Sequence, residues 1–151
     1  MGHTEITRLL NDLIETTKDS IQGFRTCAEH ASADVRRELF ERRAAVLTNH
    51  IAELNDLVLE YGGRPVLHGT AGGALHRGWV RVKEALGRSS DTELLEECER
   101  GESHALTRYH VVMNEVDLPD GVRDLLARHA DDIERHCEAL RRHHEEWHAT
   151  A

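Results

Sequence analysis

The stretch "YGGRPVLHGTAGGALHRGWVRVKEALGRSSD", residues 61–91, divides the chain into two halves that each have the pattern of two long helices. It begins with two glycines and a proline, which are residues that end a helix. A connection of roughly 30 residues can run the whole length of a helical bundle, so residues 62–91 are predicted to form a crossover. The crossover is expected to contain one short amphipathic helix whose apolar face carries Leu75, Trp79, Val82 and Leu86.

The half before the crossover has apolar residues at helical spacing from about Thr4 to Ala31, and again after the "SAD" turn as far as Tyr61. Ser32 or Asp34 in this short turn is expected to cap the second helix. Two long helices joined so tightly must run antiparallel. The residues expected to face inward are Ile6, Leu9, Leu10, Leu13, Ile21, Phe24 and Ala28 on the first helix, and Leu39, Val46, Leu47, Leu54, Leu57 and Val58 on the second.

The half after the crossover predicts a second helical hairpin. Its first helix starts near Asp91 or Thr92, "DLPDG" at residues 117–121 ends it, and Pro119 with Asp120 opens the last helix. The third helix is expected to face inward through Leu95, Leu106, Met113 and Val116. Two antiparallel hairpins joined by a long crossover form the ferritin-like variant of the four-helix bundle. The sequence therefore predicts one all-α domain over residues 1–151.

Composition limits the function classes. The chain has 151 residues and a net charge of -9, and this acidic balance makes nucleic acid and acidic membrane surfaces unsuitable partners. Three cysteines and the lack of a charged-then-apolar leader predict a reducing, cytoplasmic setting. The longest apolar runs are too short to cross a bilayer.

Polar residues interrupt the apolar stripes when each helix is projected at about 100° per residue. Glu102 lies at the centre of the stripe of the third helix, and reflection through the "DLPDG" turn places it opposite residues 133–136. Glu102 and His136 are therefore expected to be neighbours, and Cys98 and Cys137 to lie at nearly one level. The other inward polar positions are Arg43 and His50 on the second helix, His129 and Asp132 on the fourth, and Thr17, Ser20 and Cys27 on the first.

A buried carboxylate must be protonated, paired with a cation or bound to a metal. The sequence favours a structural network in which Glu102 bonds to Arg43, His136 or the Tyr109 hydroxyl and sets the helix register. In such a network, inward histidines beside carboxylates are expected to have raised pKa values, whereas metal coordination would oppose this trend.

The alternative is a metal site. His50 and His136 would supply nitrogen, and Glu102 with Asp132 or Glu99 would supply oxygen, a set suited to iron, manganese or zinc. His129 would then be an outer ligand or hydrogen-bond partner.

Other signals are weaker. The lone Glu-x-x-His pair, Glu145 and His148, lies near the chain end, and the first helix shows no inward carboxylate, so the sequence disfavours a carboxylate-bridged two-metal centre. Cys98 and Cys137 could form a disulfide or bind zinc, although cysteines on apolar stripes are more often core residues. "HGTAGGALHRG" at 68–78 matches no phosphate-loop spacing, and "RRHHEEWH" at 141–148 has the pattern of a solvated helix end.

Several stretches together resemble a known family: "LNDLIETTKDSIQGFR", "YGGRP", "GGALHRGWVRVKEAL", "ECERGE" and "DLPDGVRDLL". They are similar to the ferritin-like four-helix-bundle domain of unknown function found in bacterial proteins, over about residues 6–140. The resemblance implies a ferritin-like fold, a bacterial cytoplasmic setting and an association with stress responses, with no established activity. The "ECERGE" match includes Glu99 and Glu102.

The sequence thus predicts a non-catalytic ferritin-like bundle with a buried polar layer that binds a metal or a small ligand. Two alternatives remain. The first is a structural or interaction module that forms a homodimer or larger homo-oligomer without metal. The second is a metal-dependent oxidoreductase.

Overall fold

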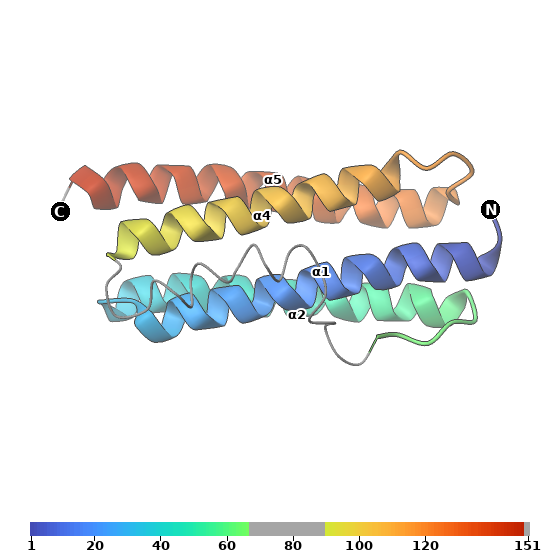
Figure 1. Ribbon diagram of the computed structural model, residues 1–151, viewed down its shortest axis with the longest axis horizontal. Coiled ribbons are helices and arrows are strands. Elements are labelled where there is room, and N and C mark those ends of the chain that lie inside the picture. Colours follow the sequence, from blue (N-terminus) through green and yellow to red (C-terminus); the bar gives the residue numbers. More distant parts are fainter. Residues whose placement is uncertain (67–89, 150–151) are drawn as a thin grey trace.

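The computed structural model describes residues 1–66 and 90–149, and within these ranges the chain forms four long α-helices and no strand. They are α1 (His3–His30), α2 (Asp34–Glu60), α4 (Asp91–Met113) and α5 (Asp120–Ala149). α1 and α2 form one antiparallel hairpin, α4 and α5 form the other, and the two termini lie at opposite ends of the bundle (Figure 1). The predicted four-helix bundle is confirmed. The predicted crossover helix and the glycine-rich stretch 68–78 lie outside the described residues.

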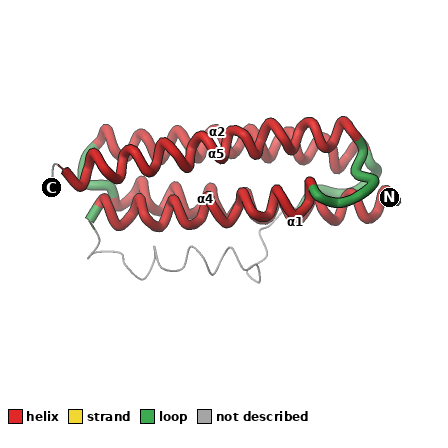
Figure 2. The backbone as a smooth tube through the Cα atoms, turned by 90° about the horizontal axis from the view of Figure 1, so that it is seen from above, coloured by secondary structure: helices red, strands yellow, loops and turns green. Residues whose placement is uncertain are grey.

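The four helices form a square in cross-section. α1 packs against α2 and α4, and α4 packs against α5. Figure 1 shows α5 in the layer of α4, whereas Figure 2, seen from above, shows it in line with α2. α2 and α5 are therefore adjacent, and their contacts include the ion pair of Arg43 with Asp132 and the ring pair of Phe40 with Trp147.

Glycine ends α2 as the sequence predicts. The backbone N–H of Gly63 donates to the carbonyl of Val58 at 2.9 Å, and that of Gly62 to Leu59 at 3.0 Å. These two bonds form a Schellman motif, which needs the left-handed φ of 79° that Gly62 adopts. A Cβ on Gly63 would lie 2.6 Å from the Thr7 side chain, so the chain passes tightly against α1 here.

The turn between α1 and α2 differs from the prediction. Ala33 occupies the N-cap of α2 and makes no side-chain cap, so the expectation that Ser32 or Asp34 caps this helix is wrong. Ser32 instead donates its backbone N–H and its hydroxyl to the buried carboxylate of Asp91, which also accepts from Arg36 at 2.8 Å. A buried carboxylate needs such donors, and they tie the first turn to the start of α4.

Two apolar clusters fill the ends of the bundle. One surrounds Phe24 and Phe40, and the other surrounds Leu10 and Leu126. Most of the predicted inward residues are buried, but Val46 and Val116 are 38% and 78% exposed. Val116 lies beyond the end of α4, and Val46 faces an open space between α2 and α5. The middle of the bundle is left to polar side chains.

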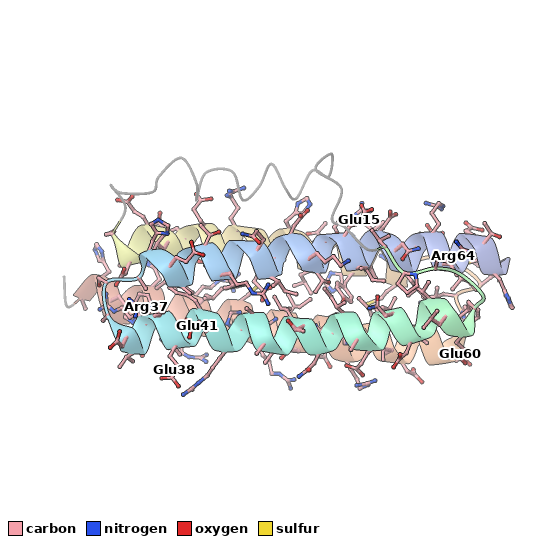
Figure 3. All side chains as sticks on the ribbon, turned by 90° about the horizontal axis from the view of Figure 1, so that it is seen from below. Glu15, Arg37, Glu38, Glu41, Glu60 and Arg64 are labelled. Carbon is pink, nitrogen blue, oxygen red and sulfur yellow. The ribbon has the colours of Figure 1, made fainter. Side chains whose placement is uncertain are left out.

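The outer surface is charged. Glu38, Glu41 and Glu60 are exposed along α2, as the side chains in Figure 3 show. None of the described helices carries an apolar stretch long enough to span a membrane.

Candidate functional site

Glu102 is the most enclosed charged group of the polar layer. Its side chain, in the middle of α4, is fully buried. The oxygen Oε2 accepts hydrogen bonds from Nε of Arg43 at 3.1 Å and from Nδ1 of His136 at 3.0 Å, and Nη2 of Arg43 approaches it at 2.9 Å. The predicted contact between Glu102 and His136 is therefore present in the structure.

Arg43 bridges two carboxylates from different helices. Its guanidinium, which is 4% exposed, contacts Glu102 of α4 and donates from Nη1 to Oδ2 of Asp132 of α5 at 2.7 Å. Burial alone would raise the pKa of Asp132, but hydrogen bonds and charge from His50 and Arg43 outweigh it and hold this pKa well below its usual range. Because a guanidinium stays protonated in proteins, Arg43 is a permanent cation at the centre of the layer.

Two imidazoles stack beside this ion pair. Nε2 of His50 lies 3.3 Å from Oδ2 of Asp132, and its ring lies parallel to that of His129 with centroids 3.9 Å apart. His129 makes a 2.9 Å hydrogen bond with the Tyr109 hydroxyl through Nδ1, and its Nε2 lies 3.2 Å from a carboxylate oxygen of Glu53.

The expected rise in histidine pKa is wrong for His129. Burial, and then the neighbouring charge of His50, lower the pKa of His129 to about 4 and outweigh the opposing effect of Glu53. The unfolded chain therefore binds a proton near pH 6.5, whereas the folded protein binds it only near pH 4. The free energy of unfolding is therefore unaffected by this group above pH 6.5. It decreases as the pH falls toward 4, because the unfolded chain takes up a proton that the folded protein does not.

Five of the six residues proposed as metal ligands belong to one connected layer. The exception is Glu99, whose carboxylate lies apart from the layer and accepts from Arg141 at 2.7 Å. Sequence reasoning missed Glu53 and did not anticipate that Tyr109 would bond to His129. The connected residues run in the order Glu53, His129, His50, Asp132, Arg43, Glu102 and His136.

Cys98 contacts a cysteine that was not paired with it in the sequence-based prediction. Sγ of Cys98 on α4 lies 3.4 Å from Sγ of Cys27 on α1, because α1 packs directly against α4. All three thiols are free and buried. Burial, with Cys27 as the next cause, raises the pKa of Cys98 well above its ordinary value, and burial raises that of Cys137 to about 11. These thiols act as small core residues.

The layer does not fit a metal ion in this arrangement. The carboxylates of Glu102 and Asp132 contact Arg43, and each of them is also contacted by one imidazole, that of His136 or of His50. Carboxylate and imidazole are ligand types that iron, manganese and zinc accept. The guanidinium already contacts Oε2 of Glu102 and Oδ2 of Asp132, so a divalent ion bound to these two atoms would have to displace it. Among the described residues, no three His, Cys, Asp or Glu side chains are placed around a common point at metal-binding distances.

Comparison with known proteins agrees with this architecture. A family model described as "Domain of unknown function (DUF2383)" matches residues 5–115. The chain belongs to this family. No curated protein sequence matches the chain.

Among solved structures, the fold is similar to that of the bacterioferritin-related protein from Bacteroides fragilis, which is described as a dodecameric thioferritin. The TM-score is 0.78 at 17% identity, and the match covers 99% of this chain and 90% of that one. The ferritin-like fold predicted from the sequence is confirmed by this likeness.

Proposed function

We propose that this DUF2383 protein is a non-catalytic ferritin-like bundle that acts as a structural or interaction module assembled from several copies of the chain. In this proposal the buried polar layer carries its own cation and fixes the register of three helices. The family resemblance adds an expected association with stress responses in a bacterial cytoplasm.

The observation that carries the proposal is the position of Arg43. Its guanidinium joins α2 to Glu102 of α4 and to Asp132 of α5. A planar group with several fixed donors matches carboxylates only in a narrow range of helix positions, so it selects one register. The assembly part of the proposal is supported by the dodecameric state named for the neighbour from Bacteroides fragilis.

The test measures metal content and assembly together. Purified wild-type protein and the variants Glu102→Ala and His136→Ala are analysed for iron, manganese and zinc, and light scattering gives the mass of the wild-type particle. We expect no stoichiometric metal in the three proteins and a mass of several chains for the wild type. Stoichiometric metal in the wild type that both variants lose would refute Arg43 as the resident cation, and a monomer would refute the assembly.

Divalent metal binding is the second candidate. It is supported by the two carboxylates, Glu102 and Asp132, that contact one buried cation, and by the imidazoles of His136 and His50 beside them. The thioferritin name of the structural neighbour also supports it. Removing the guanidinium should free these ligands for a metal. We therefore expect Arg43→Ala to bind Zn²⁺ or Mn²⁺ at least tenfold more tightly than the wild type in calorimetric titrations. Equal affinity in both proteins would remove this candidate.

Oxidoreductase activity is the remaining candidate, and it would need a reaction with oxygen. Oxygen consumption by the wild-type protein with ferrous iron, above the rate without protein, would be needed to support it. The buried side chains of α1, a helix whose residues are all described, include no carboxylate that could complete a two-metal centre.

A further inference from the structure

A cavity of about 270 Å³ opens between α2 and α5, next to the polar layer. Its walls are apolar and include Phe40, Leu95, Leu140 and Trp147. Arg43 and His136 also line it, and because both contact the fully buried Glu102, they form its inner end. The cavity is therefore an apolar chamber with a polar floor.

The floor presents one hydrogen-bond acceptor. Nδ1 of His136 bonds to the carboxylate of Glu102, which can only accept, so Nδ1 carries the proton. In the neutral ring Nε2 is then an acceptor. Within the described part of the chain this nitrogen makes no hydrogen bond, and it is not one of the buried atoms that lack a partner. Glu102 thus orients His136 with its second nitrogen free to receive a donor.

The charges around the cavity favour a neutral ligand. Arg43 is compensated by Glu102 and Asp132, and Arg42 at the rim is paired with Glu38 at 2.8 Å. An anion at Arg43 would also meet Glu102 and Asp132, whose two negative charges exceed the single positive charge of the guanidinium. A cation would have to give up its water against apolar walls.

The walls favour a flat ring system. The rings of Phe40 and Trp147 meet edge to face with centroids 6.1 Å apart, and the guanidinium of Arg36 lies 4.4 Å from the centroid of Trp147. Aromatic side chains in such arrangements offer ring faces and edges to a further ring. An apolar cavity of about 150 Å³ is enough for benzene, so the larger space here suits two fused rings.

We propose that this cavity binds a neutral, planar aromatic molecule of one or two fused rings that donates one N–H or O–H hydrogen bond to Nε2 of His136. This proposal goes beyond the proposed function. It assigns a class of ligand to the apolar cavity, which has no part in setting the register of the helices. It also assigns Glu102 a positioning role toward that ligand.

The experiment compares indole with benzofuran, which has nearly the same shape but no N–H. Calorimetric titration of the wild-type protein measures both affinities, and nuclear magnetic resonance follows the side-chain signals of Trp147 and His136. We expect saturable indole binding that shifts both signals, and benzofuran binding about fivefold weaker because the hydrogen bond is lost.

Two variants test the location without altering the polar layer. Ala139→Phe on α5 fills the cavity and should reduce indole affinity at least tenfold. Ala45→Phe, on the exposed face of the neighbouring helix α2, is the matched control and should bind indole as the wild type does. Both variants are first checked for wild-type helicity.

Each outcome decides the proposal. The absence of saturable indole binding to the wild type would overturn it, as would binding that survives in a folded Ala139→Phe protein. Equal affinity for indole and benzofuran would overturn the hydrogen bond to His136. These measurements are independent of metal content and particle mass, so the ligand proposal and the assembly proposal can fail separately.

Discussion

Replacing Arg43 by methionine tests the buried ion pair most directly. Methionine keeps much of the side-chain length but removes the charge, and it leaves Glu102 in an enclosed site with His136 as its one remaining contact on Oε2. Glu102 cannot turn to water, because its side chain is fully buried. The substitution should therefore destabilise the protein far more than the loss of a surface ion pair would.

The magnitude follows from the geometry. Opposite charges about 3 Å apart attract by roughly 5 kcal/mol at an effective dielectric constant of about 20, and desolvation offsets part of this attraction. Removing one partner of a buried pair typically costs about 3–5 kcal/mol. We expect Arg43→Met to lower the free energy of unfolding by this amount, from a total of about 5–15 kcal/mol. For a chain of this size the melting temperature should fall by roughly 6–20 °C.

A double-mutant cycle separates the ion pair from packing. Urea unfolding followed by circular dichroism is measured for the wild type, Arg43→Met, Glu102→Leu and the double variant, with unchanged slopes required. The double variant should recover at least about 2 kcal/mol relative to the sum of the two single losses. Additive losses, or a cost below about 1 kcal/mol for Arg43→Met, would refute the assignment of Arg43 as the cation that compensates Glu102.

Three further predictions concern single groups. Lowering the pH from 6.5 to 4 should reduce the free energy of unfolding by about 3 kcal/mol at most, and His129→Phe should flatten this slope in urea titrations. Asp91→Asn should cost about 2–3 kcal/mol by thermal unfolding, because Ser32 loses its carboxylate partner, whereas Asp34→Asn at an exposed site should cost under about 0.5. Iodoacetamide should modify Cys98 only as fast as the protein opens, as mass spectrometry at rising urea concentrations would show.

The contact between Glu102 and His136 could be predicted from the sequence because two regularities combine. Helical projection identifies which side chains face inward, and the short connection between α4 and α5 determines how far along the two helices any pair lies. The same reasoning placed the apolar side chains that were assigned to the inner face of α1, all of which are buried. Such predictions depend only on local geometry.

The partner from α2 could not be chosen in the same way. The crossover that precedes α4 leaves the register of α2 against α4 open, and both Arg43 and His50 face inward. Arg43 proves to contact Glu102, and His50 joins through Asp132. Glu53 was missed because its side chain is 40% exposed and lies at the edge of the stripe.

The pKa of His129 shows a second limit of sequence reasoning. A carboxylate near an imidazole was expected to raise the pKa, and Glu53 does act in that direction. The stacking of His50 on His129 joins side chains from α2 and α5, so neither helix pattern reveals it. Burial and this neighbour together outweigh the carboxylate, because desolvation disfavours the charged ring and a second imidazolium would repel it.

The guanidinium and the cavity depend on each other through the spacing of α2 and α5. Arg43 reaches Glu102 and Asp132 through different nitrogens, so the two carboxylates need not share one point. A metal ion would require its ligand atoms within about 2.0–2.2 Å of a single centre, which would draw these helices together. Closer helices would narrow the space between them that the aromatic ligand is proposed to fill. In Arg43→Ala, zinc and indole should therefore compete, and zinc that leaves indole affinity unchanged would contradict this coupling.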